Sequence, residues 1–278
     1  MTTTKSATTT KSPGRGSADA IKLTFPRVLV SEWFKIVSLR SGVAALVAMP
    51  IALIGGAAFT AVGIVVKESP PAAEAVAADP TGGYLSGVGL AQLVAVVVGV
   101  VAVTGEYRST MIRSSLAAVP TRIPLVWGKA AVVAAVTTLI AVAALLPAFL
   151  VARAIVAIAN VSLSLTIAGS TQTMIGSALL LGITAAWAVG CGWLLRNTAA
   201  AIFALLGVLY ILPSLAGVLP QPLIQIVGPL LPSYAVAAVT RAAAVDGALP
   251  PWLGLLVYTG YAVITLAAAA LVLRRRDA

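Results

Sequence analysis

Long apolar runs separated by short polar segments dominate the hydropathy pattern of this chain. Six of these runs, each about twenty residues long, contain no Asp, Glu, Lys, Arg or His. A helix of about 20 apolar residues can cross the roughly 30 Å hydrocarbon layer because it satisfies its own backbone hydrogen bonds. The pattern therefore predicts an all-α integral membrane protein with six spans, at approximately residues 43–66, 85–104, 130–152, 174–195, 198–219 and 252–273.

The polar segments before and between these runs predict the remaining parts of the chain. Residues 1–25 begin with a stretch rich in Thr, Ser and Lys that has almost nothing apolar to bury, so we expect a disordered tail. Residues 26–278 then form one six-span domain. Gln221 to Val245 is uncharged over residues 223–239 but interrupted by Pro229 and Pro232, and we predict short, partly re-entrant helices on the outer face.

The segment PRVLVSEWFKIVSLR, which precedes the first span, has an amphipathic pattern. On a helix of 3.6 residues per turn, Arg27, Ser31 and Lys35 share one narrow arc, and Trp33 and Phe34 lie on the opposite side. This pattern predicts a helix lying in the membrane interface, with its aromatic side chains at headgroup depth and its cations towards anionic lipid. The residues expected to contact the membrane are Arg27, Trp33, Phe34 and Lys35.

The basic residues predict the orientation of the six spans. Of the 18 Lys and Arg residues, only Lys67, Arg153 and Arg241 fall on one side of the membrane, and the rest fall on the other. The positive-inside rule makes the richer side cytoplasmic, together with both termini. Counting residues 223–239 as a seventh span would move the basic C-terminal end, Arg274 to Arg276, outside, against this bias.

Composition excludes several kinds of function. The chain of 278 residues is 60% hydrophobic and 9% charged, with a mean hydropathy of +1.05, whereas soluble domains carry about a quarter charged residues. The net charge of +10 comes from residues at the ends of spans and not from a basic face, so we expect no nucleic-acid partner. One cysteine, Cys191, and no histidine exclude an internal disulfide and histidine-based metal or catalytic sites.

The spans also lack a recognisable source of energy for transport. Carriers that use ion gradients usually hold protons or cations on buried Asp, Glu or His, and the six spans have none. The chain has no GxxxxGK[ST] phosphate-binding loop and no TVGYG-like channel filter. If the protein transports a substrate against a gradient, a partner must supply the work.

The stretch GEYRSTMIRSSLAAVPTR, residues 105–122, is the longest predicted cytoplasmic loop between spans. It is long enough for about three helical turns before Pro120. Apolar Met111, Ile112 and Leu116 could seat in a groove of another protein, with charged neighbours setting the orientation. From the residues alone, a loop that only closes two spans, with arginines that obey topology, is equally compatible.

Four segments together resemble the type-2 ABC permease family, the membrane subunits of ATP-binding cassette transporters. They are SEWFKIVSLRS before span one, the stretch at residues 105–122, LLPSYAVAA before span six, and the basic end LRRRDA. The resemblance covers roughly residues 28–278. It implies six spans with an interfacial helix before span one, a cytoplasmic coupling helix after span two and re-entrant outer helices before span six.

The resemblance also implies partners and a role. The coupling region of this family sits in a cleft of a separately encoded ATPase, and its acidic residue, here Glu106, helps to engage that partner. Two ATPase copies and a second permease subunit would complete the complex, with ATP and Mg²⁺ bound by the ATPase and neither cofactor nor enzymatic activity in this chain. The docking residues expected here are Glu106, Arg108, Met111, Ile112, Arg113 and Leu116.

The expected function is export, from a bacterial cell membrane, of a drug-like, peptide, lipid or other amphipathic substrate, as in multidrug resistance. An ATP-independent secondary or facilitative carrier with six spans is the alternative. A membrane anchor or sensor that transports nothing is a third possibility.

Overall fold

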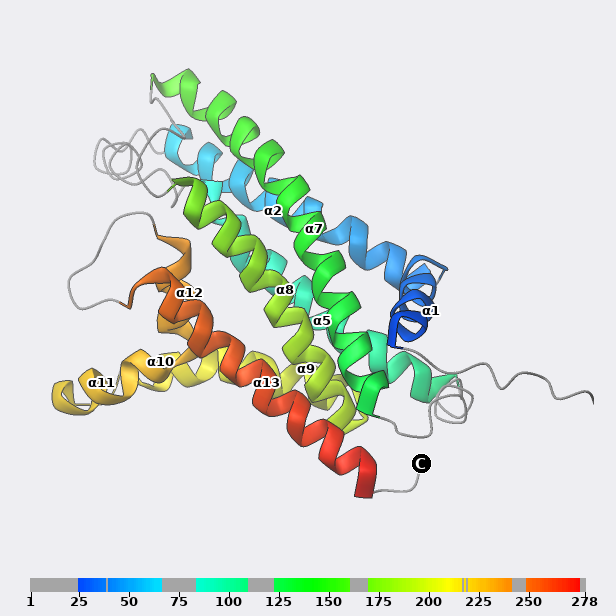
Figure 1. Cartoon of the computed structure of the whole chain (residues 1–278). Helices are drawn as coiled ribbons and strands as arrows, with labels where there is room; N and C mark the ends of the chain where they lie inside the picture. The colour runs from blue at the N-terminus through cyan, green and yellow to red at the C-terminus, as the bar shows by residue number, and fades with distance from the viewer. Residues whose placement is uncertain are drawn as a thin grey trace, which may run out of the picture.

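The computed structural model describes residues 25–38, 40–66, 84–109, 123–160, 170–216, 218, 220–241 and 249–275 (Figure 1). Every regular element in these ranges is helical. Because the long helices are apolar on all sides, they have no polar face to turn towards water, as expected for helices that cross a bilayer.

Within the described ranges, six helices are long and apolar enough to cross a membrane, as the sequence predicts. Five of them are single α-helices, and the sixth is continued by a π-helical turn, η2. Their bounds are α2 Arg40–Val66, α5 Gly87–Arg108, α7 Ile123–Val156, α8 Ser170–Leu195, α9 Thr198–Leu206 followed by η2 Gly207–Ile211 and α10 Leu212–Ala216, and α13 Pro251–Arg275.

Several of these helices extend further than the apolar runs predict, α5 and α7 among them. The second span was expected to end at Thr104, but α5 continues through Glu106 to Arg108. The third was expected to begin at Ala130, but α7 begins at Ile123 and includes Lys129. An apolar run marks only the part of a helix that suits hydrocarbon, so the helix itself can continue into the charged residues that follow.

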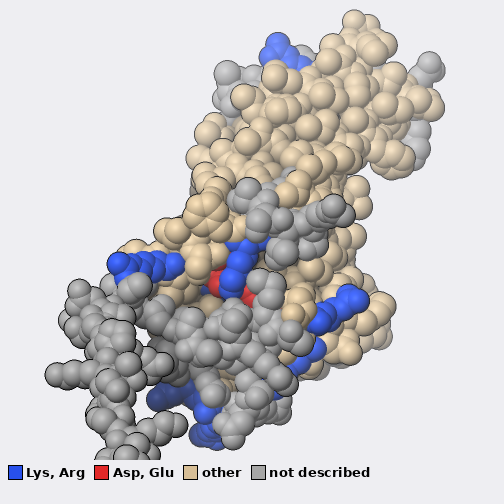
Figure 2. Space-filling view, turned by 90° about the vertical axis from the view of Figure 1, so that its right-hand side faces the viewer, with Lys and Arg blue, Asp and Glu red and all other residues tan. Residues whose placement is uncertain are grey.

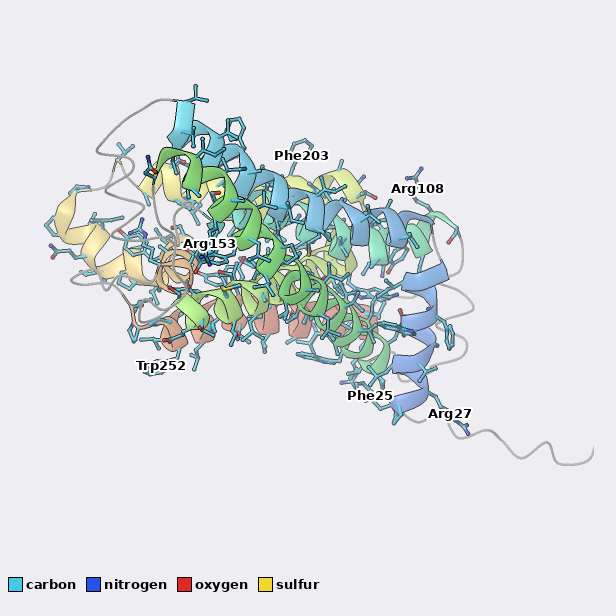
Figure 3. The ribbon with its side chains drawn as sticks, turned by 90° about the horizontal axis from the view of Figure 1, so that it is seen from above. Phe25, Arg27, Arg108, Arg153, Phe203 and Trp252 are labelled. Atoms are coloured by element: carbon cyan, nitrogen blue, oxygen red, sulfur yellow. The ribbon has the colours of Figure 1, made fainter. Side chains whose placement is uncertain are left out.

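The amphipathic segment before the first span forms α1, Phe25–Ser38. This helix lies across one end of the bundle, roughly crosswise to the long helices (Figures 1 and 3). Its buried Val28 lies against Gly128 of α7, where an added Cβ would approach within 3.0 Å of the Val28 side chain. The sequence-based prediction of a helix is confirmed here.

Two short helices precede α13. They are α11, Gln221–Val227, which a 3₁₀ turn at Gly228–Leu230 extends, and α12, Pro232–Thr240. The chain bends by 71° between them, at Leu231, because Pro232 disfavours a helical conformation at the residue before it. The short helices expected over Gln221–Val245 are therefore present as far as the described residues extend.

Helix α8 occupies the centre of the bundle and packs on α5, α7 and α13 (Figure 1). Glycines bring the backbones together, as small residues commonly do in membrane helices. An added Cβ at Gly99 of α5 would collide with the carbonyl oxygen of Ala185 and with the Ala188 side chain. Gly182 of α8 likewise faces Thr138 and the Ala134 carbonyl of α7.

We predict that Gly99→Ala destabilises the protein because its new methyl group has no room between α5 and α8. Overpacking of this kind costs about 1–3 kcal/mol. Thermal unfolding of the purified protein in detergent should show a midpoint lower by several degrees.

The matched control is Gly89→Ala in the same helix, where an added Cβ meets nothing within 4 Å. Alanine has the better helix propensity, so this variant should be as stable as the original protein or slightly more stable. Equal destabilisation of both variants would contradict the close α5–α8 contact.

Candidate functional site

Four charged side chains from three helices meet at the end of the bundle that α1 crosses. Glu32 and Lys35 belong to α1, Glu106 to the last turn of α5, and Lys129 to the second turn of α7. Each lysine contacts both glutamates, so the four groups form a closed ring of opposite charges. We call this ring the ion quartet.

The ring is tightly hydrogen-bonded. Lys35 Nζ lies 2.6 Å from Glu32 Oε1 and 2.9 Å from Glu106 Oε1. Lys129 Nζ lies 2.8 Å from the same Glu106 oxygen and also donates to Glu32 Oε2. Both lysines therefore share one oxygen of Glu106, while Glu32 offers a separate oxygen to each.

The ion quartet is buried although it consists of charges. The exposed fraction of the side chain is 1% for Glu32, 4% for Lys129 and 5% for Glu106, against 21% for Lys35. Removing charges from water costs several kcal/mol per ion and is offset only by close, well-bonded partners. Two cations and two anions give no net charge, so burial of the four together is energetically acceptable, whereas burial of any one of them without its partners is not.

The sequence brings these residues together in a simple way. A spacing of three places Glu32 and Lys35 on one face of α1. Glu106 and Lys129 lie on either side of residues 110–122, where α5 ends and α7 begins, so both reach the same end of the bundle. Helix α1 lies across this end and supplies one charge of each sign.

The environment of Lys35 keeps it charged. Burial alone would lower the pKa of its ammonium group, but the hydrogen bonds and negative charges of Glu32 and Glu106 outweigh burial and raise the pKa above its ordinary value of 10.5. The stabilisation that depends on this charge is therefore fully present below pH 10.5, and it disappears only as the pH rises through the raised pKa.

The structure distributes the predicted membrane-contacting residues of α1 between two environments. Arg27 is exposed, and so are Trp33 and Phe34, with exposed fractions of 46% and 64% (Figure 3 labels Arg27). Lys35 differs from the expectation, because its ammonium group lies against Glu106 in the ion quartet and not among outward-facing cations. The helical wheel could not reveal this, since the attracting carboxylate lies 71 residues away.

The predicted docking residues also lie in different environments. Glu106 is buried and bonded to helices of its own chain, whereas Arg108, one half-turn later, is exposed at the end of α5 (Figure 3). Met111, Ile112, Arg113 and Leu116, together with the expected coupling helix, lie outside the described residues.

Basic residues gather at the same end of the bundle as the ion quartet. Figure 2 shows most of the visible Lys and Arg atoms at one end, where the acidic atoms also appear. Helices α5, α8 and α13 end there, and of the basic residues whose side chains the structure describes, seven lie at that end and two at the opposite end. The seven are Arg27, Lys35, Arg108, Lys129, Arg196, Arg274 and Arg275, and the two are Arg153 and Arg241.

A second polar group lies deeper in the bundle, and the sequence-based reasoning missed it. Gln92 Nε2 donates to the Tyr258 hydroxyl at 2.8 Å, and that hydroxyl lies 2.9 Å from Thr184 Oγ1. Tyr210, on the π-helical turn η2, donates to Gln92 Oε1 at 3.2 Å. A glutamine inside an otherwise apolar run was the available signal, since buried amides require partners.

The sequence was compared with models of known protein families and with curated proteins, and neither comparison finds a match. The part of the chain that the structure describes is helical and has six helices long and apolar enough to cross a membrane. Within the described residues, the ion quartet is the site where charge, burial and convergence of helices coincide.

We predict that Glu32→Gln strongly destabilises the protein, because two buried lysines would then share the single charge of Glu106. Breaking a buried ion pair by removing one partner costs about 3–5 kcal/mol. Adding Lys129→Met restores charge balance. The double variant should therefore lose clearly less stability than the sum of the losses in the two single variants.

Unfolding curves in detergent for both single variants and the double variant measure this coupling. Arg108→Gln serves as the control, since it removes an exposed charge two residues from Glu106 and should leave the midpoint almost unchanged. Additive effects of Glu32→Gln and Lys129→Met would show that the two side chains do not interact.

Proposed function

We propose that this chain is the permease subunit of a type-2 ABC exporter, with both termini in the bacterial cytoplasm. The observation that carries the proposal is the stretch at residues 105–122. It resembles the coupling region of that family, and Glu106, its single acidic residue, is held by α1 and α7. The chain catalyses nothing itself, and its ATPase partner binds ATP and Mg²⁺.

The ion quartet gives the coupling stretch a mechanical connection to the bundle. A push on residues 110–122 acts on the end of α5 and the start of α7, and the quartet joins both to α1. Separating any one of these helices would expose unpaired charges to a medium of low dielectric constant. The three ends therefore move together when the ATPase dimer closes on ATP.

This connection assigns Glu106 an indirect role in coupling. Its side chain is buried, so it positions the helix that carries the coupling stretch, while exposed Arg108 is available to touch the ATPase. Met111, Ile112, Arg113 and Leu116 remain the proposed docking residues of the coupling helix.

The remaining elements fit a half-transporter. Helix α1, with its exposed Trp33 and Phe34, would lie in the inner interface of the membrane. The bent pair α11 and α12 would enter the outer leaflet without crossing it. A second permease subunit and two ATPase copies complete the complex, and the exported substrate would be drug-like, peptide, lipid or otherwise amphipathic.

We predict that Arg108→Glu weakens binding of the ATPase encoded beside this chain about tenfold, because charge reversal at a docking surface turns attraction into repulsion. Co-purification and ATP hydrolysis stimulated by the permease both measure the effect. Arg275→Glu is the matched control, since it reverses an exposed charge at the end of α13 on the same side of the bundle.

A second experiment separates the proposal from an ATP-independent carrier. Substrate flux in liposomes should require both the ATPase and ATP. Flux that persists without them and stops when the ion gradient collapses would overturn the proposal in favour of a gradient-driven carrier, and flux unaffected by the protein would leave an anchor or sensor.

A further inference from the structure

A cavity of about 620 Å³ lies beside the ion quartet, between α1, α2, α5 and α7. Its walls are apolar and include Ala48 of α2 and Val94, Val98 and Val101 of α5, whereas the quartet forms its polar end. The volume falls within the about 300–1,000 Å³ of typical small-molecule sites. A cavity with apolar walls and one polar end suits a molecule with a long apolar body and a small polar head.

One atom at the polar end lacks a partner. Glu106 Oε1 accepts hydrogen bonds from both lysines, but Glu106 Oε2 is buried and has no hydrogen-bond partner among the described residues. Buried carboxylate oxygens are rarely left unpaired. A donor on a molecule bound in the cavity would complete the bonding of this oxygen.

The charges at the polar end of the cavity restrict which kind of molecule can supply this donor. The quartet has no net charge, and its one incompletely bonded oxygen is anionic, so a cationic donor is favoured there and an anion is repelled. Lys35, the least buried member of the quartet, also lines the cavity and can face a negative group a few ångströms away. A head group with a cation beyond a phosphate matches both features.

We propose that this cavity binds an aminophospholipid such as phosphatidylethanolamine. Its ammonium group donates a hydrogen bond to Glu106 Oε2, its phosphate lies near Lys35, and one acyl chain fills the apolar part. Leu93 and Val97, which line the cavity, are exposed on α5, so the site opens towards the side that would meet lipid. The site is independent of the ATPase and of the exported substrate.

A series of head groups tests the role of the N–H donor. Phosphatidylethanolamine and its mono-, di- and trimethylated forms keep the positive charge while the number of N–H groups falls from three to none. The delipidated full-length protein is titrated with each lipid in detergent, and bound lipid is counted by native mass spectrometry. Since a hydrogen bond to a charged group is among the stronger ones, we expect affinity to drop about tenfold at the last methylation.

Three results would overturn the proposal. Equal binding of all four lipids would show that the cavity selects only for acyl chains. Tighter binding of phosphatidylglycerol than of phosphatidylethanolamine would show that the basic residues of this end dominate. No lipid bound at all would show that water or a segment of the chain itself satisfies Glu106 Oε2.

Filling the cavity provides a test that leaves the ion quartet intact. Gly105 lines the cavity, and an added Cβ there meets nothing within 4 Å, so Gly105→Leu should project into the space that the acyl chain needs. We expect this variant to lose the preference for phosphatidylethanolamine. Gly89→Leu, at a site on the same helix that is equally open but outside the cavity, should retain it, and retention in both variants would place the lipid elsewhere.

Discussion

The arrangement of helices at one end of this molecule depends on burying four charges together. Glu32, Lys35, Glu106 and Lys129 are separately expensive to remove from water, and each becomes acceptable only because the other three are present. This requirement brings α1 against the bundle at a fixed position, and it keeps the end of α5 beside the start of α7. Apolar contacts such as that of Val28 with Gly128 then add packing to an arrangement that the charges specify.

The six long helices could be predicted because lipid imposes a severe constraint on the backbone. A chain segment that crosses hydrocarbon must satisfy every peptide group internally, so its length and lack of charge are visible in the sequence. Different local signals predicted α1, whose pattern has a helical period, and the interruption that Pro229 and Pro232 introduce. The coupling helix, in contrast, lies outside the described residues, and its existence stays a prediction.

The ion quartet was beyond the reach of sequence patterns because its members are distant in the chain. Glu32 and Lys129 are separated by 97 residues, and helical periodicity reports only on neighbours within a few turns. Lys35 was therefore assigned to the cationic arc directed at anionic lipid, and Glu106 to a partner, although each has its main contacts inside the chain. A useful signal was the pair of opposite charges three residues apart, Glu32 and Lys35, on the amphipathic helix α1.

The π-helical turn η2 affects how the segment after it should be interpreted. Such a turn accommodates an additional residue relative to an α-helix, which shifts the direction of all later side chains by about 100°. A helical wheel drawn with one period from Thr198 to Ala216 therefore assigns the wrong neighbours to α10. Removing one residue from Gly207–Ile211 would rotate α10 by about 100° about its axis, so insertions and deletions are far less neutral here than in a loop.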